Sequence, residues 1–557
     1  MKPILLLVSF ILVAFGQPAW VWWFGLLASV CGFALFWRVL LDIDRPVERF
    51  CIAMGWYAAV QIVQLSWFIS HPYAYIYVVL VLLAWILGAQ CGLVALWITP
   101  KTFKSRISLS ALAALWVLLE WSRLFIFSGL SLNPTGIALT GSIYPMQLAS
   151  LGGVYFLSFW IILTNLAALR AWLSHFKLAD TLVLLSFILI PYIYGAVHYH
   201  YHENKADNSP TVSVLLIQPA LPIEENLGFQ SADEARAFVL NEWKIILGTT
   251  TKQLSQKIDL IVLPEYVVPY GTYHTIYPID DVRKLFTDLF GPDSSKAFPS
   301  MDTGFGAYVK TDKGMLWLVS NAFIVQAFAN LFNADVIVGL EDADYNDELK
   351  INENFSAAFH FKPGGSVPVR YEKQVLLPMG EYIPFDWCRQ LAAKYGITGS
   401  FTPGKEAKVF NGPVPMSASI CYEETFGNLM RETRIKGAEL LVNLTNDGWY
   451  PSSRLPRQHF DHARLRTVEN GIPLARACNT GLTGACDSLG RIIALLGTSD
   501  TQAQQLSDSL KVSIPTYHYR TLYTWWGDVF VLSLCIVILL AVCALFIKHR
   551  LTEIKRH

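Results

Sequence analysis

The sequence predicts a polytopic α-helical membrane domain of about eight helices, joined to an α/β domain. Two observations lead to this fold class. First, the 557 residues are 53% hydrophobic and only 15% charged, with a mean hydropathy of +0.39, which is too apolar for an ordinary soluble enzyme. Second, apolar runs close to the bilayer-crossing length of about 20 residues flank a long segment with the composition of a globular domain.

Eight apolar runs are legible. The first resembles the hydrophobic part of a signal peptide, but the second follows directly after Gln17-Pro18 without a small-residue cleavage site, so we expect the first to be retained. The runs predict a seven-helix domain at 1–199 and a last helix with its tail at 525–557. They cover residues 3–16, 20–41, 51–70, 75–98, 107–126, 148–169, 180–199 and 525–547.

The distribution of Lys and Arg predicts which side each loop faces. With the N-terminus in the cytoplasm, the inward loops all carry Lys or Arg and the outward loops carry none, as the positive-inside rule requires. Residues 200–524 then lie outside the cytoplasm and are tethered to the membrane at both ends. The inward segments are 38–49, 101–106, 170–177 and 548–557, and the outward ones are 17–18, 70–74 and 128–146.

The segment 200–524 alternates strand-like and helix-like stretches, which favours an α/β domain. Helix-like stretches cover 231–247, 426–436 and 457–469. Strand-like runs cover 212–219, 258–265, 335–342, 356–363, 415–423, 439–447, 473–480 and 483–493.

Three strand ends in this segment carry groups that suit nucleophilic catalysis. Glu265 follows the run IDLIVLP and could act as a general base, Lys373 could stabilise an oxyanion, and Cys421 ends the run PMSASI. Each residue alone has a commoner explanation, because a buried Cys is usually a small core residue and Glu and Lys are usually solvated. Together they predict an acyl-transfer site built on a cysteine.

The surrounding motifs resemble a known family. In order they are PE, YEKQVLLPMGEYIPF, ICYE, NLTNDGWY and RTVENGIPLARACNTG. This set is similar to the nitrilase superfamily of carbon–nitrogen hydrolases, and the flanking helices make the chain similar to one membrane branch, the bacterial apolipoprotein N-acyltransferases. The resemblance covers nearly the whole chain.

The resemblance implies an α-β-β-α sandwich at 200–524 and a Glu-Lys-Cys triad of Glu265, Lys373 and Cys421. It also implies supporting roles for Glu381, Tyr422 and Glu423. The implied reaction moves a fatty acyl chain from a phospholipid, through a thioester on Cys421, to the α-amino group of a diacylglyceryl-modified lipoprotein. The expected location is the bacterial inner membrane, among membrane lipids, with the catalytic domain on the periplasmic side.

No cofactor, metal or nucleic-acid partner is expected. The formal net charge is zero, which removes the electrostatic basis for nucleic-acid binding. The His459/His462 pair lacks further ligands, and none of the nine cysteines has a zinc-site spacing.

Two departures from the family pattern stand out. The family usually has a tryptophan near the position of Leu227, which puts a substrate contact in question. The interval between Glu265 and Lys373 is long, and residues 270–333 look like an insertion.

Aromatic residues Phe385 and Trp387 either cover the core or dip into the membrane interface, and the sequence favours neither interpretation.

Two other functions remain open on the residues alone. A membrane-tethered amidase or nitrilase would use the same triad with water and a small amide, although eight helices exceed what an anchor needs. A transporter or receptor with a ligand-binding outer domain is a different class. Against it, the predicted spans carry few ionisable residues, mainly Glu120 and Arg123.

Overall fold

The computed structural model describes residues 2–223, 229–301, 304–311, 314–348, 350–365, 367–394 and 400–554. Its chain forms two compact units. The first comprises Met1–Asn204, Ser453–Gly471 and Tyr519–His557, and the second comprises Lys205–Ser452 and Ile472–His518. Leu227, where the family usually has tryptophan, lies outside the described residues.

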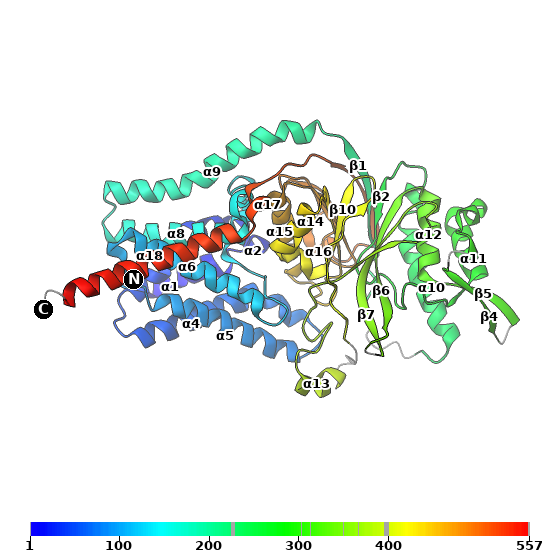
Figure 1. Ribbon diagram of the computed structural model, residues 1–557, viewed down its shortest axis with the longest axis horizontal. Coiled ribbons are helices and arrows are strands. Elements are labelled where there is room, and N and C mark those ends of the chain that lie inside the picture. The colour runs from blue at the N-terminus through cyan, green and yellow to red at the C-terminus, as the bar shows by residue number, and fades with distance from the viewer. Residues whose placement is uncertain are drawn as a thin grey trace. The chain divides into compact units, whose positions relative to one another are not determined.

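The first unit is helical, and helices occupy all eight predicted apolar runs (Figure 1). Helix α2 continues through η1 (Ala28–Gly32) into α3, so these form one span. The helices are α1 (Lys2–Ala14), α2 (Pro18–Leu27), α3 (Phe33–Leu40), α4 (Pro46–Gln64), α5 (Tyr75–Ala95), α6 (Arg106–Ser122), α8 (Ala149–Leu173), α9 (Leu178–Asp207) and α18 (Val529–Ile554).

Six spans within the described residues are long and apolar enough to cross a membrane. Helix α1 has only 13 residues, and α4 is not among the six, so the predicted number of about eight crossings stays a prediction. The six are Pro18–Leu40, Tyr75–Ala95, Arg106–Phe125, Ala149–Leu173, Leu178–Asp207 and Val529–Lys548.

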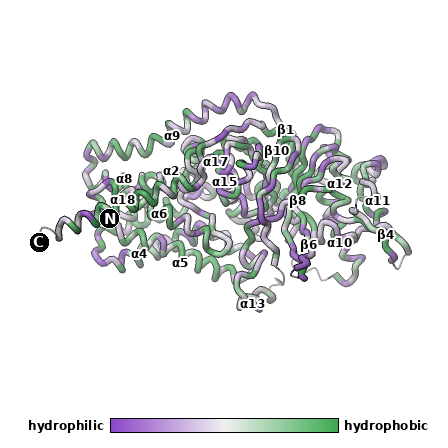
Figure 2. The backbone as a smooth tube through the Cα atoms, in the orientation of Figure 1, coloured by the Kyte–Doolittle hydropathy of each residue, from purple (hydrophilic) through white to green (hydrophobic). Residues whose placement is uncertain are grey.

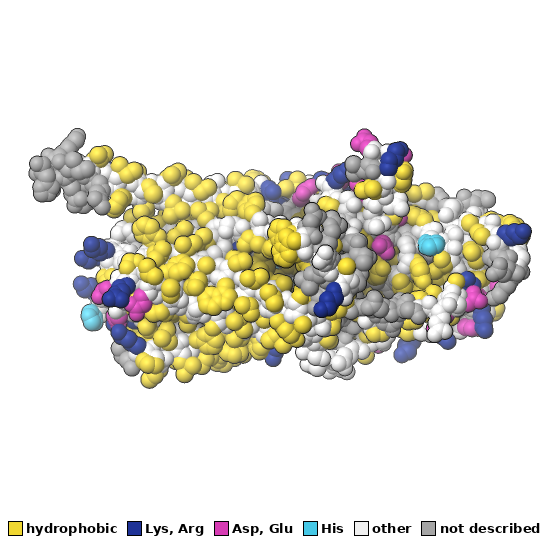
Figure 3. Space-filling model, turned by 90° about the horizontal axis from the view of Figure 1, so that it is seen from below, with side chains coloured by type: hydrophobic (Ala, Val, Ile, Leu, Met, Phe, Trp, Pro, Cys, Tyr) yellow, Lys and Arg dark blue, Asp and Glu magenta, His cyan; other side chains and the backbone are white. Residues whose placement is uncertain are grey.

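The outer surface of these helices is apolar. Figure 2 shows hydrophobic residues along most of their length, and Figure 3 shows hydrophobic side chains covering much of the visible face of the helical unit. Large side chains are exposed on α5, α9 and α18, among them Trp85, Ile193 and Leu540. Exposed apolar side chains of this kind suit a lipid environment better than water.

The expected outward loop 128–146 is folded rather than extended. It contains η5 (Thr135–Gly141) and α7 (Ile143–Met146). Glu120 on α6 anchors it, because Glu120 Oε1 accepts hydrogen bonds from Thr135 N at 2.7 Å and from Thr135 Oγ1 at 2.6 Å. Arg123 instead donates through Nε to Gln90 Oε1 at 2.7 Å, so the two ionisable residues have different partners.

Helix α15 (Leu455–Asn470) groups with the helical unit, although its sequence lies inside the expected 200–524 domain. Its polar side chains hydrogen-bond to residues of the helical unit. Gln458 Nε2 donates to Gln64 O at 2.8 Å and accepts from Trp67 Nε1 at 3.0 Å. Glu469 Oε1 accepts from Val154 N at 2.8 Å. The short helix α17 (Leu522–Trp526) belongs to the same unit.

The second unit contains two six-stranded sheets. The first has the order β15-β1-β2-β6-β7-β8, and the second has the order β14-β13-β12-β11-β10-β9. The first sheet comprises β1 (Thr211–Gln218), β2 (Leu260–Val262), β6 (Asp335–Asn346), β7 (Ile351–Phe361), β8 (Val369–Glu372) and β15 (Asp508–Pro515). The second comprises β9 (Phe410–Asn411), β10 (Pro415–Ile420), β11 (Leu440–Thr445), β12 (Leu474–Cys478), β13 (Gly484–Cys486) and β14 (Ile492–Leu495).

These sheets and their helices form the layers of the expected sandwich. Apolar side chains from both sheets, such as Ile337 and Val442, form one buried cluster. A second cluster, which includes Trp243 and Phe328, joins the first sheet to α10 (Ala232–Gly248) and α12 (Asn321–Phe332). Helix α14 (Gly427–Ile435) packs beside β10, and the remaining short helices are α13 (Arg389–Lys394) and α16 (Asp500–Ala503).

The stretch 270–333 has its own secondary structure. It forms a three-stranded sheet of order β3-β5-β4 and contributes α12, which packs against β6 and β7 of the first sheet, and α11, which packs against α10. Its elements are β3 (Tyr277–Pro278), α11 (Ile279–Phe290), β4 (Gly306–Thr311) and β5 (Gly314–Val319).

Candidate active site

The strand directions of the second unit bring three predicted site residues together. Glu265 follows β2, Cys421 follows β10, and Lys373 follows β8, which runs in the same direction as β2. Side chains at the carboxyl ends of such strands meet at one edge of the sheets. Lys373 Nζ lies 2.9 Å from Glu265 Oε1, and the charge of the Glu265 carboxylate reaches the Cys421 thiol and raises its pKa.

Lys373 is a buried cation between two carboxylates. Its Nζ contacts Glu381 Oε1 at 2.6 Å as well as Glu265, and its side chain is 1% exposed. Burial alone would lower the pKa of Lys373, but the charges of Glu265 and Glu381 raise it well above its usual range. The ammonium therefore stays charged at neutral pH.

Cys421 is a neutral thiol in this arrangement. Burial raises the pKa of Cys421, and the carboxylate of Glu265 raises it further, whereas Lys373 opposes the shift. Its backbone has a φ of +55°, a left-handed conformation that residues with a side chain rarely adopt. A sharp turn from strand to helix exposes a nucleophile in this way. The thiol needs a base to become reactive.

Glu265 has the environment of a base. Burial raises its pKa above the usual carboxyl value, and nearby Glu381 adds to this, while Lys373 opposes it. A carboxylate with a raised pKa holds a proton more readily during a reaction cycle.

Glu381 and Glu423 shape the loop that carries Lys373. Glu381 Oε2 accepts from Leu377 N at 2.8 Å.

Glu423, fully buried, ties this loop to β10. Its carboxylate accepts hydrogen bonds from Tyr371 OH at 3.0 Å, Gln374 N at 2.6 Å, Val375 N at 3.2 Å and Ile420 N at 2.8 Å. Burial raises the pKa of Glu423 to about 7, although these backbone N–H groups oppose the shift.

Tyr422 is also buried beside the cysteine. Its ring packs edge-on against Phe426, with the ring centroids 5.0 Å apart. Its side chain therefore helps to pack the turn that follows Cys421.

Sequence reasoning missed a polar group next to Cys421. Asn443 Nδ2 donates to Cys421 O at 3.3 Å, and Arg476 Nη1 donates to Asn443 Oδ1 at 2.9 Å. Both residues lie inside quoted motifs, NLTNDGWY and LARACNTG. An Asn and an Arg at positions expected to be buried in otherwise apolar strands could have predicted this group, since such residues are rarely buried without a partner.

The aromatic segment near the Lys373 loop is exposed. Phe385 is 45% and Trp387 is 77% exposed, and the two rings stack on each other at 5.8 Å. The interpretation that they cover the core is therefore wrong.

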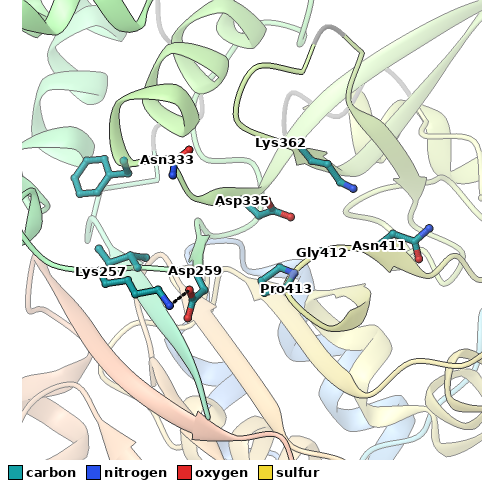
Figure 4. Close-up of a pocket in the computed structure, with 10 residues that line it drawn as sticks. Lys257, Asp259, Asn333, Asp335, Lys362, Asn411, Gly412 and Pro413 are labelled. Carbon is teal, nitrogen blue, oxygen red and sulfur yellow. Dashed lines mark ion pairs between the residues drawn. The ribbon is translucent and has the colours of Figure 1, made fainter. Parts of the chain in front are cut away.

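A pocket of about 550 Å³ lies elsewhere in the second unit. Its lining includes Lys257 and Asp259 before β2 and Asp335 at the start of β6 (Figure 4). These are the amino ends of the strands, opposite the ends that carry Glu265 and Cys421. None of the predicted site residues lines it.

Comparison with known proteins identifies the family. Residues 9–167 match the apolipoprotein N-acyltransferase N-terminal domain, and residues 232–506 match the carbon-nitrogen hydrolase family. The apolipoprotein N-acyltransferase of Chlamydia caviae is 34% identical over 542 residues, covering 94% of this chain and 93% of the relative. The chain belongs to the apolipoprotein N-acyltransferase family.

Further relatives carry the same name. The apolipoprotein N-acyltransferase of Chlamydia pneumoniae is 33% identical over 94% of this chain and 93% of its own length. That of Chlamydia trachomatis is 29% identical over 98% of this chain and 97% of its own length. The resemblance inferred from the motifs is thus confirmed, as is the combination of a helical membrane domain with a nitrilase-like α/β domain.

Proposed function

We propose that this protein transfers a fatty acyl chain from a phospholipid, through a thioester on Cys421, to the N-terminal amino group of a diacylglyceryl-modified lipoprotein. The observation that carries the proposal is the position of one buried carboxylate, Glu265, which contacts the Lys373 ammonium at 2.9 Å and raises the pKa of the Cys421 thiol. Family membership supports the substrate class, since the relatives are named apolipoprotein N-acyltransferases.

The first half-reaction loads the enzyme. Glu265 takes the thiol proton while the Cys421 sulfur attacks the carbonyl carbon of a phospholipid ester. The Lys373 ammonium and the backbone N–H of Tyr422 stabilise the resulting oxyanion. When the tetrahedral intermediate collapses, the ester C–O bond breaks and Glu265 returns the proton to the leaving lysophospholipid. An acyl thioester remains on Cys421.

The second half-reaction unloads it. The free α-amino group of the lipoprotein attacks the thioester carbonyl, and Glu265 accepts the proton that this nitrogen loses. The C–S bond breaks, an amide forms, and the Cys421 thiol takes the proton back. Because one product leaves before the second substrate reacts, the kinetics are ping-pong.

The membrane helices fit lipid substrates. Each buried CH₂ holds a lipid in a bilayer by about 0.8 kcal/mol, so both substrates must be met at the membrane. The exposed Phe385 and Trp387 suit an interfacial position, where Trp is enriched. We place the catalytic unit on the periplasmic side of a bacterial inner membrane, following the Lys and Arg distribution of the loops.

Intact-mass spectrometry of the detergent-purified protein tests the proposal. After exposure to phospholipid, we expect a mass increase of one fatty acyl group that hydroxylamine removes. The Cys421→Ala variant should gain none, and Cys388→Ala, which changes another buried cysteine of the same unit, should behave as the wild type.

Two results would change the conclusion. Hydrolysis of small amides without any acyl adduct would favour a membrane-tethered amidase that uses the same residues. An adduct that persists in Cys421→Ala would place the nucleophile elsewhere.

A further inference from the structure

A buried arginine lies in the network that surrounds Cys421. Arg476 on β12 is 0% exposed. Its guanidinium forms ion pairs with Glu424 and with Asp447 Oδ2, the latter at 3.2 Å. Burial opposes the charge, but these two carboxylates raise the pKa of Arg476 above its ordinary value. The site therefore contains a second fixed cation besides Lys373.

Asn443 connects this cation to the nucleophile. Ser419, Asn443 and Arg476 lie side by side in register on β10, β11 and β12. Asn443 Nδ2 donates to Ser419 Oγ at 3.0 Å and to Cys421 O at 3.3 Å, and its Oδ1 accepts from Arg476 Nη1 at 2.9 Å. A guanidinium has donors only. Arg476 thus forces the amide oxygen of Asn443 towards itself and the amide NH₂ towards Cys421.

The backbone of Cys421 is where this orientation matters. Its φ of +55° is disfavoured for a residue with a side chain, and such a conformation persists only when its surroundings hold it. Asn443 holds the carbonyl of Cys421, and Arg476 holds Glu424 three residues later in η10 (Cys421–Thr425). Both constraints on the turn lead back to one guanidinium.

We propose that Arg476 is a positioning residue for the nucleophile: through Asn443 and Glu424 it keeps Cys421 in the left-handed conformation that directs the thiol at Glu265. This inference rests on the proposed acyl transfer and adds to it a group that touches no reacting atom. Its effect is on the rate of thioester formation, because misplacing a reacting group by about 1 Å can cost roughly 100-fold in rate.

Three variants separate this role from simple stabilisation. Asn443→Asp keeps the size of the side chain and still accepts from Arg476, but it cannot donate to the carbonyl of Cys421. Arg476→Gln removes the charge, and Arg476→Lys restores it without the fixed fork of a guanidinium. Arg491→Gln is the matched control, since Arg491 pairs with Asp207 and Asp487 beside the edge strand β14.

The measurement is the rate of acyl-enzyme formation from phospholipid, per folded molecule, with the melting temperature recorded in parallel. We expect Asn443→Asp and Arg476→Gln to lower the rate at saturating phospholipid by about 100-fold, with an unchanged KM. Arg476→Lys should fall between them and the wild type, and Arg491→Gln should match the wild type.

A wild-type rate in Asn443→Asp would overturn the inference, even if Arg476→Gln does not fold. A lower melting temperature with an unchanged rate per folded molecule would do the same. If the wild type itself forms no thioester, the proposed function falls and this inference with it. A wild type that forms the thioester while Asn443→Asp equals it rejects the positioning role alone.

Discussion

At the scale of single residues, a glycine sets the place of the proposed base. Gly339 on β6 lies so close to the turn after β2 that a Cβ there would be 2.6 Å from the Cα of Glu265 and 2.7 Å from Pro264 O. Both are backbone atoms of the turn and cannot rotate away. We therefore predict that Gly339→Ala displaces Glu265 and lowers the rate of thioester formation by about 10- to 100-fold.

The control for this variant is Gly271→Ala. A Cβ at Gly271 would meet only Glu341 O at 3.7 Å, an ordinary contact, so this change should leave the rate near that of the wild type. The check is a single-turnover assay on both proteins. Equal rates in the two variants would mean that the turn adapts and that Gly339 has no bearing on the base.

The sequence predicts the proposed catalytic residues better than the residues that hold them in place. Glu265 and Cys421 each follow an expected strand, and all three proposed triad residues stand in distinctive motifs, although β8, which precedes Lys373, was not among the expected strands. Gly339 and Arg476 act through close approach and through partners on other strands. Such contacts exist only after the sheets have formed, and the local pattern of the sequence does not contain them.

At the scale of elements, Glu423 ties the loop after β8 to the end of β10. Burial raises its pKa to about 7, whereas a Glu side chain in an unfolded chain has a pKa of about 4.3. Because the pKa of Glu423 is higher in the folded state than in the unfolded state, its protonation stabilises the folded state fully at pH values below the unfolded pKa. That contribution then falls as the pH rises, until the pH passes about 7.

We predict this pH dependence from the comparison of wild type with Glu423→Gln. The difference in unfolding free energy between them should decrease by on the order of 3 kcal/mol from pH 4 to 7, at about 1.4 kcal/mol per pKa unit, and stay level above. Thermal unfolding in detergent at several pH values measures it. Glu432→Gln, at an exposed ion pair with Lys436, should give no such change, and parallel curves for Glu423→Gln would contradict the prediction.

Element boundaries show where the periodic pattern is sufficient. The largely apolar runs of β1, β6 and β10 mark buried strands, and the structure has them within a few residues of the expected ranges. The run 483–493 was expected as one strand but is two, β13 and β14, because Gly490 has a φ of +78° and turns the chain between them. The edge strand β15 was not among the expected strands, although Leu510, Val512 and Ile514 alternate with polar residues in the pattern of a half-buried strand.

At the scale of the whole molecule, the division into units follows tertiary contacts that composition does not reveal. Helix α15 is surrounded in sequence by strands of the α/β unit, yet its polar side chains hydrogen-bond to the helical unit. A buried polar group needs a partner, and that requirement decides where α15 belongs. The hydropathy pattern showed two regions, while the exchange of one helix between them depended on side-chain pairing.

The orientation of the chain in the membrane gives the last prediction. Arg170 and Lys177 flank the turn between α8 and α9, and positively charged short loops stay in the cytoplasm. The α/β unit follows α9 and should therefore lie on the opposite, periplasmic side.

An epitope inserted after His175, in the exposed turn, should react with antibody in spheroplasts only after the membrane is opened. One inserted after Pro292, which is exposed in the second unit, should react in intact spheroplasts. Reaction of the first insertion alone in intact spheroplasts would reverse the topology and place the catalytic unit in the cytoplasm, away from lipoproteins exported to the periplasm.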